Sequence, residues 1–124
     1  MIRIDTHVAV WLYAGDLDRF SVTAKHALDE EQISASPLVQ LELTYLHEIG
    51  RLSVGGAEIF GDLSERIGLR ISQQPTSAVV ASASPLSWTR DPFDRMIVGD
   101  ALSENLRLLT KDELIRKNVP TAFW

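Results

Sequence analysis

The sequence predicts a three-layer α/β/α fold, in which helices cover both faces of a short central parallel sheet of four or five strands. Short apolar segments alternate along the chain with longer amphipathic segments. This alternation is typical of strands that are joined by helices in a parallel sheet. The chain has 124 residues, a length that suits one domain with its own core. We therefore expect a single domain over residues 1–124.

The expected strands are short and mostly apolar. They span residues 2–5, 32–35, 69–71 and 107–110, and residues 119–123 are a candidate edge strand. Each strand is followed by a segment with helical spacing of its apolar residues, as parallel pairing requires. The ligand crevice of such a sheet lies at the carboxyl ends of the strands. The residues that directly follow each strand are therefore candidates for function.

The expected helices have recognisable start and stop signals. Ser21 and the pair Ser36–Pro37 are typical of helix N-termini, and Gly15, Gly50 and Gly68 are typical of helix ends. The expected helices span residues 6–14, 23–31, 37–49, 56–67, 76–83, 92–105 and 111–118.

The composition narrows the class of protein. The chain is 45% hydrophobic and 23% charged, as in ordinary globular proteins. It has no cysteine, which excludes disulfides, thiolate zinc sites and thiol nucleophiles, and a cytoplasmic location fits. No apolar run approaches the roughly 20 residues of a membrane span, and Asp5 and His7 make the N-terminus a poor signal peptide. We expect no membrane association.

The net charge of −5 argues mildly against binding of nucleic acid by phosphate neutralisation alone. Bound metal cations would reverse the local field and weaken that argument.

Four acidic residues interrupt the apolar pattern or lie at strand ends. Asp5 ends the first expected strand, and Asp112 lies just past the strand at 107–110. Glu42 and Asp94 each lie in a helical stripe of apolar residues. The apolar neighbours of Glu42 are Leu38, Leu41, Tyr45, Leu46 and Ile49, and those of Asp94 are Ile97, Val98, Ala101 and Leu102.

A carboxylate on a core face costs several kcal/mol unless it is paired, and four carboxylates in one pocket would repel each other. A divalent cation removes this conflict, and oxygen-only donors favour Mg²⁺ or Mn²⁺. Structural roles compete with this interpretation. Asp94 suits the positive end of a helix, Glu42 could pair with an arginine, and Asp5 and Asp112 could be cap or turn residues.

Three segments resemble the PIN-domain nucleases, and most closely the small VapC-like toxins of bacterial toxin–antitoxin pairs. They read IDTHVAVWL, LVQLELTYLHEIGRLSV and RDPFDRMIVGDALSENLRLLTKDELI. The resemblance covers nearly the whole chain and implies a PIN-like fold. It also implies a metal-dependent ribonuclease that uses one or two Mg²⁺ or Mn²⁺ ions. The catalytic metal ligands that it implies are Asp5, Glu42, Asp94 and Asp112.

The resemblance and the surrounding sequence suggest further site residues. Thr6 and Thr110 match hydroxyl positions beside the first and fourth acids, and Asp91 matches an additional aspartate that also suits a helix N-cap. Candidate phosphate contacts are Arg90, Arg95 and Lys111. His7 is a conceivable general base, although a packing role is favoured.

The sequence departs from the family pattern at two places. Trp88 and Thr89 stand where a histidine often precedes Arg-Asp-Pro, and Gly99 stands where alanine is more usual. Glycine at this helical position costs about 1 kcal/mol relative to alanine.

The resemblance implies hydrolysis of RNA by a metal-activated water, which leaves 5′-phosphate and 3′-hydroxyl ends. It also implies inhibition by a small antitoxin protein and formation of a homodimer. tRNA, rRNA and mRNA all remain candidate substrates. Two alternatives are a catalytically inactive PIN-like binding module and a receiver-type phosphoacceptor domain. The receiver alternative is disfavoured because Asp5 stands alone after the first strand and Glu42 lies inside a helix.

Overall fold

The computed structural model describes all 124 residues and contains one five-stranded sheet. The strand order is β3-β2-β1-β4-β5, and every neighbouring pair is parallel. The strands are β1 (Ile2–Ile4), β2 (Ile33–Ala35), β3 (Arg70–Ile71), β4 (Arg107–Leu109) and β5 (Ala122–Phe123). The predicted parallel sheet is confirmed, including the edge strand at its C-terminal end.

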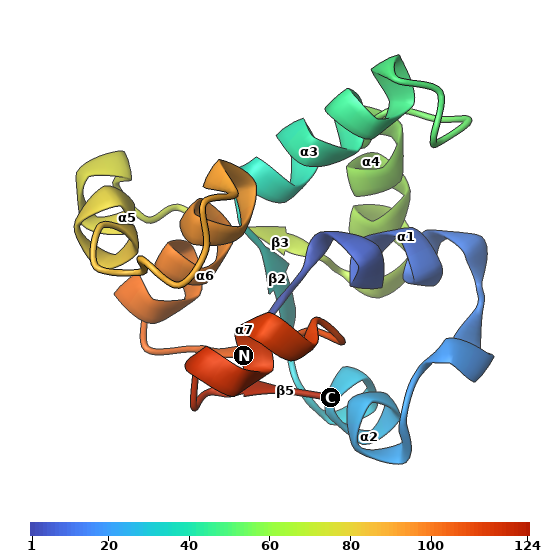
Figure 1. Cartoon of the computed structure of the whole chain (residues 1–124). Helices are drawn as coiled ribbons and strands as arrows, with labels where there is room; N and C mark the ends of the chain where they lie inside the picture. The colour runs from blue at the N-terminus through green and yellow to red at the C-terminus, as the bar shows by residue number, and fades with distance from the viewer.

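Helices cover the sheet on both faces. In Figure 1, α5 and α6 lie together on one side of β2 and β3, and α1 and α4 lie on the other. None of these helices combines the length and the hydropathy that a membrane crossing requires. The helices are α1 (Thr6–Ala14), α2 (Val22–Glu30), α3 (Pro37–Glu48), α4 (Gly56–Ile67), α5 (Thr76–Ala83), α6 (Pro92–Ser103) and α7 (Glu113–Asn118), with a 3₁₀ turn η1 (Leu17–Arg19).

Capping groups account for most helix boundaries. The Ser21 and Ser36 hydroxyls accept hydrogen bonds from the backbone at the starts of α2 and α3. Asp5 caps α1, and Asp112 caps α7. Both β1 and β4 end one residue earlier than the sequence predicts. The two acids expected at strand ends are therefore helix caps as well. The turn η1 was not predicted.

The central strand carries a buried charge that the sequence analysis did not predict. Ile2 and Ile4 are fully buried on one face of β1, and Arg3 is buried on the other. The Arg3 guanidinium lies 2.8 Å from the Asp100 carboxylate of α6 and also pairs with Glu104, directly after that helix. It donates to the Ser34 hydroxyl of β2 at 2.7 Å as well. A charge this deep is stable only when it is paired, so Arg3 joins β1, β2 and α6.

Gly99 allows α5 and α6 to pack closely. A Cβ atom at this position would lie 2.8 Å from the Ala83 Cβ and 2.8 Å from the Val79 carbonyl oxygen. Both contacts are shorter than van der Waals packing permits. The glycine that costs helix stability in isolation is therefore required where the two helices meet.

We expect Gly99→Ala to destabilise the protein by about 1–3 kcal/mol through overpacking, despite the better helix propensity of alanine. Thermal denaturation followed by circular dichroism measures this. Gly61→Ala in α4 is the matched control, because a Cβ there meets no atom within 4 Å. The control should be neutral or stabilising by up to about 1 kcal/mol. Equal stabilisation by both substitutions would contradict the close packing.

Candidate functional site

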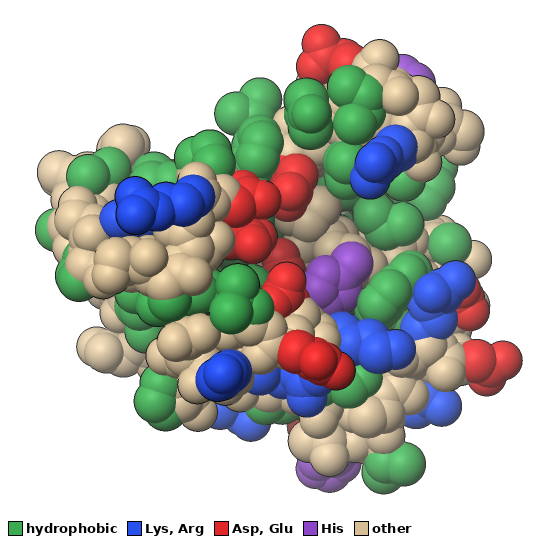
Figure 2. Space-filling model, in the orientation of Figure 1, with side chains coloured by type: hydrophobic (Ala, Val, Ile, Leu, Met, Phe, Trp, Pro, Cys, Tyr) green, Lys and Arg blue, Asp and Glu red, His purple; other side chains and the backbone are tan.

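The four predicted acids line one open pocket of about 240 Å³ at the carboxyl ends of β1 and β4. Figure 2 shows acidic side chains gathered in a hollow near the centre of the view, with a histidine beside them. Asp5 directly follows β1, and Asp112 follows β4. Glu42 comes from α3 and Asp94 from α6. The remaining lining residues are Thr6, His7, Val10, Trp11 and Leu46.

Asp5 lies at the bottom of the pocket and is 4% exposed. Its Oδ1 accepts a hydrogen bond from the Thr6 backbone N–H at 2.7 Å, and its Oδ2 accepts one from the Thr110 hydroxyl at 2.6 Å. The β1–β4 register pairs Ile4 with Leu109 and so places Thr110 beside Asp5. Both oxygens are therefore held in fixed positions.

Thr110 connects two of the acids. Its buried hydroxyl donates to Asp5 and accepts from the Asp112 backbone N–H at 3.1 Å. One Asp112 oxygen caps α7 by accepting from the Ile115 N–H at 2.9 Å. The other Asp112 oxygen makes no hydrogen bond and is available to a ligand.

Glu42 reaches the pocket from α3, where it accepts a hydrogen bond from the Thr6 hydroxyl. Burial raises the pKa of Glu42, as do the negative charges of Asp5 and Asp91, while the Thr6 hydrogen bond opposes the shift. The prediction that Glu42 interrupts a buried apolar stripe is wrong in part. Its stripe neighbours Leu41, Tyr45 and Ile49 are exposed, and the buried side of α3 carries Val39 and Leu43.

Asp94 is the least satisfied acid of the pocket. It lies half-buried in the first turn of α6, and its carboxylate makes no hydrogen bond or ion pair. Burial is the main cause that raises the pKa of Asp94 to about 7, and the charges of the neighbouring acids add to it. Those acids are Asp5, Asp91, Asp112 and Glu42. Near neutral pH the Asp94 carboxyl is therefore poised between its two protonation states.

Asp91 has a structural role at the start of α6. Its Oδ1 accepts from the backbone N–H groups of Phe93 at 2.9 Å and Asp94 at 3.3 Å. The side chain is the N-cap of the helix, in agreement with its capping signal in the sequence. Asp91 thus orients Asp94 and also adds negative charge beside it.

The predicted cationic residues lie in different places. The Arg95 guanidinium donates to the Ser84 carbonyl at 2.8 Å, which holds it against the end of α5 and outside the acidic pocket. Arg90 is exposed in the loop before α6. Lys111 is exposed beside the pocket, and its backbone N–H donates to the Nε2 atom of His7 at 2.9 Å.

His7 lines the pocket, with Nδ1 at 3.6 Å from the Asp5 Oδ2. Because Nε2 accepts a hydrogen bond, the neutral ring carries its proton on Nδ1. Burial lowers the pKa of His7, and the negative charges of Asp5 and Asp112 oppose this shift.

The sequence singled out His7 only by its place after Asp5. Trp11 and Leu46 were not predicted in the pocket, although each lies one helical turn after a pocket residue.

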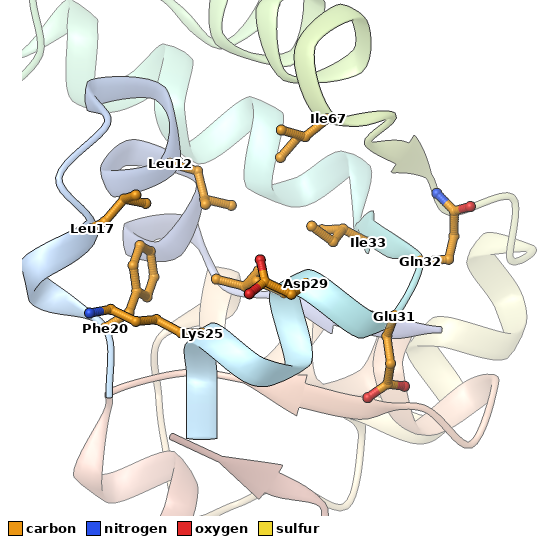
Figure 3. Close-up of a pocket in the computed structure, with 10 residues that line it drawn as sticks. Leu12, Leu17, Phe20, Lys25, Asp29, Glu31, Gln32, Ile33 and Ile67 are labelled. Carbon is orange, nitrogen blue, oxygen red and sulfur yellow. The ribbon is translucent and has the colours of Figure 1, made fainter. Parts of the chain in front are cut away.

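The largest cavity has a different chemistry. It measures about 520 Å³ and lies on the side of the sheet that Ile33 faces. Figure 3 shows apolar side chains around it, among them Leu12 of α1, Ile33 of β2 and Ile67 of α4, together with Lys25 and Asp29 of α2. Six of its ten lining residues are hydrophobic. The acidic pocket is therefore the better candidate for a reaction site.

Comparisons with known proteins show the family of the chain. The sequence model of the PIN domain matches residues 2–118. Ribonuclease VapC22 of Mycobacterium tuberculosis is 29% identical over 129 residues, which cover 99% of this chain and 98% of that protein.

Two solved structures share the fold. One is VapBC2 from Rickettsia felis bound to a DNA fragment from its promoter, with a TM-score of 0.68 and 16% identity over 99% of this chain and 96% of that chain. The other is a toxin–antitoxin complex from Klebsiella pneumoniae, with a TM-score of 0.68 and 16% identity over 100% of this chain and 97% of that chain.

The family match spans nearly the whole chain and includes all four acids of the pocket. This match excludes the receiver-type alternative, which the sequence already disfavoured. The chain belongs to the PIN domain family.

Proposed function

We propose that this chain is a metal-dependent endoribonuclease and the toxin of a toxin–antitoxin pair. The observation that carries the proposal is Asp94, a half-buried carboxylate without a partner whose pKa is raised to about 7 by burial and by the other acids. A protein that keeps such an acid unpaired gains stability when a cation binds beside it. Family membership and the similarity to a ribonuclease support the same reaction.

The donor set fits Mg²⁺ or Mn²⁺, one or two ions. All four candidate ligands, Asp5, Glu42, Asp94 and Asp112, offer carboxylate oxygens, which these hard cations prefer. No three of the side chains meet closely enough to form a ready-made metal site. We infer that Asp94, whose carboxylate makes no hydrogen bond, turns toward Asp5 on binding. A bound divalent cation supplies activation of water and compensation of the phosphate charge.

The protein itself positions the acids around the reacting phosphate. Thr6 and Thr110 hold Asp5 and Glu42 in place, and the neutral His7 directs its Nδ1 side toward Asp5. The chain has no cysteine, and no side-chain nucleophile is required when water attacks. The expected products carry 5′-phosphate and 3′-hydroxyl ends.

Two partners follow from the toxin assignment. We infer a small antitoxin protein, because one of the solved structures with this fold is a toxin–antitoxin complex. A basic side chain of the antitoxin would satisfy the acidic pocket in place of a metal ion. We also infer a homodimer and a cytoplasmic location.

One observation favours a second candidate, an inactive PIN-like binding module. The carboxylates do not converge into a ready-made site. A module of this kind would bind its partner through the acidic pocket without cleaving RNA. Activity of the purified chain distinguishes the two functions.

We expect the purified chain, freed of any partner, to cleave total RNA in Mn²⁺ or Mg²⁺ and to lose this activity in EDTA. Asp94→Asn should lower cleavage by about 100-fold or more, because loss of even an indirect metal contact costs about 10- to 100-fold. Asp29→Asn, on the exposed side of α2, is the matched control and should retain full activity. Cleavage in EDTA, or equal activity of the two variants, would contradict the proposal.

Thr110→Val should lower cleavage by about 10- to 100-fold while the protein stays folded. The substitution keeps the side-chain volume but removes the hydroxyl that joins Asp5 to the Asp112 backbone. Rates of RNA cleavage and a circular dichroism spectrum measure both effects. Thr44→Val is the control, because the Thr44 hydroxyl bonds only to the Gln40 carbonyl within α3. A wild-type rate for Thr110→Val would show that this bridge has no functional role.

The stability of the metal-free protein should depend on the ionisation of Asp94. Its pKa is raised from 3.8 to about 7 in the folded chain, so between these values the folded state binds more protons than the unfolded state. The stabilisation from this group is therefore complete below about pH 4 and is lost as the pH rises to about 7.

We therefore expect Asp94→Asn to be more stable than the parent at pH 8 in EDTA, by about 1–2 kcal/mol after allowance for solvent screening. The difference should shrink toward pH 4, where Asp94 is protonated. Melting temperatures across this pH range measure the effect, and Asp29→Asn should show no such trend. A parent that is as stable as Asp94→Asn at pH 8 would contradict the strained ionisation of Asp94.

A further inference from the structure

A group of aromatic and cationic side chains borders the acidic pocket. We call Trp11, Arg19, Lys111 and Trp124 the Trp11 strip. The Arg19 guanidinium lies 5.2 Å from the Trp11 ring centroid, and the Lys111 ammonium lies 5.9 Å from it. The Trp124 ring is edge-on to Trp11, with 5.7 Å between the centroids. Segments from α1, η1, the β4–α7 loop and the C-terminus thus meet at one indole.

The strip is continuous with the pocket. Trp11 lines the pocket together with the four acids. The His7 ring lies between them, with its centroid 4.9 Å from that of Trp11, and it accepts a hydrogen bond from the Lys111 backbone. In Figure 2, hydrophobic and Lys or Arg side chains lie on the far side of the histidine from the acidic cluster. A polymer that reaches the acids from this side must cross the strip.

The two cationic side chains of the strip, Arg19 and Lys111, are exposed to solvent. The Lys111 ammonium has no carboxylate within ion-pair distance, and its side chain is exposed. Arg19 pairs only with Asp16, at 2.7 Å, in an exposed contact that contributes little to stability. The net charge of the chain is −5 and the pocket is acidic. A phosphodiester strand therefore needs local cations next to the pocket to remain there.

We propose that the Trp11 strip binds the single-stranded RNA that flanks the cleaved bond. An unpaired base stacks on Trp11, and Lys111 and Arg19 contact the phosphates on either side of that base. Stacking on an indole requires a base that is free of its own helix, so the strip selects single-stranded over duplex RNA. This inference rests on the proposed ribonuclease function and assigns the residues that hold the strand beside the acids.

The test uses binding, so that it does not depend on cleavage. The parent is the full chain with Asp94→Asn, and the probe is a fluorescently labelled single-stranded RNA of mixed sequence, followed by anisotropy at several salt concentrations. Lys111→Gln removes one cation, and Trp11→Leu removes the stacking surface, while Trp11→Phe keeps an aromatic ring. Lys25→Gln, on the exposed face of α2 beside the apolar cavity, is the matched control.

Lys111→Gln should reduce the slope of log affinity against log salt by about 0.7, the value for one phosphate contact with a single strand. Trp11→Leu should weaken binding by about 5-fold or more at an unchanged slope, and Trp11→Phe should retain most of the affinity. Duplex RNA of the same sequence should not distinguish Trp11→Leu from its parent. Lys25→Gln should leave every value unchanged.

Three outcomes would overturn the inference. If Lys111→Gln and Trp11→Leu both bind the single strand as Lys25→Gln does, the strip is not the RNA site, and the ribonuclease proposal stands. If the parent binds no RNA at low salt, both proposals fail. If the variants weaken binding of a partner protein but not of RNA, the strip is a protein interface. Should Trp11→Leu prove unfolded by circular dichroism, the slope of the exposed Lys111→Gln variant decides alone.

Discussion

The parallel pairing of β1 with both of its neighbours is the constraint on which the site depends. Ile4 lies level with Ala35 of β2 and with Leu109 of β4. The next residues, Asp5 and Thr110, therefore emerge at the same edge of the sheet and bond to each other. Because the strands are so short, the chain turns into a helix at once. The same carboxylates that end strands cap helices and face the pocket.

Two charged groups near β1 have opposite environments. The Arg3 charge is paired with Asp100 of α6 and with Glu104 at the end of that helix, and Arg3 also donates to the Ser34 hydroxyl of β2. These contacts link the sheet to α6 and compensate the Arg3 charge. At the carboxyl edge, the Asp94 carboxylate has no hydrogen bond or ion pair, and the charges that shift its pKa are those of other acids. The Arg3 charge is thus paired within the chain, whereas the Asp94 carboxylate has no partner there.

The sequence predicted the sheet and the four acids because both leave strong local signals. Apolar periodicity and capping residues mark the elements, and an acid such as Asp94 is visible where it breaks an apolar face. The sequence did not reveal features that depend on which helices meet. Arg3 has no visible partner until α6 packs over β1, and Gly99 resembles a weak helix residue until α5 lies against it.

Similar limits apply around the pocket. Arg95 was a plausible phosphate contact by its position beside Asp94, but its helical direction carries it to α5. Trp11 and Trp124 are far apart in the chain and meet only because β5 brings the C-terminus beside α1. The apolar stripe around Glu42 in α3 was expected to be buried, but several of its residues are exposed. Helical spacing alone does not distinguish a buried face from an exposed apolar one.

Calorimetric titration of Mn²⁺ into the purified, partner-free chain at pH 6.5 tests the central claim most directly. Repeating it in two buffers of different ionisation enthalpy counts the protons released on binding. Because the pKa of Asp94 is raised to about 7, we expect binding to release more than about half a proton, and Asp94→Asn to lose both the release and most of the affinity. Absence of Mn²⁺ binding, or the same binding without proton release in both proteins, would contradict a metal site at Asp94.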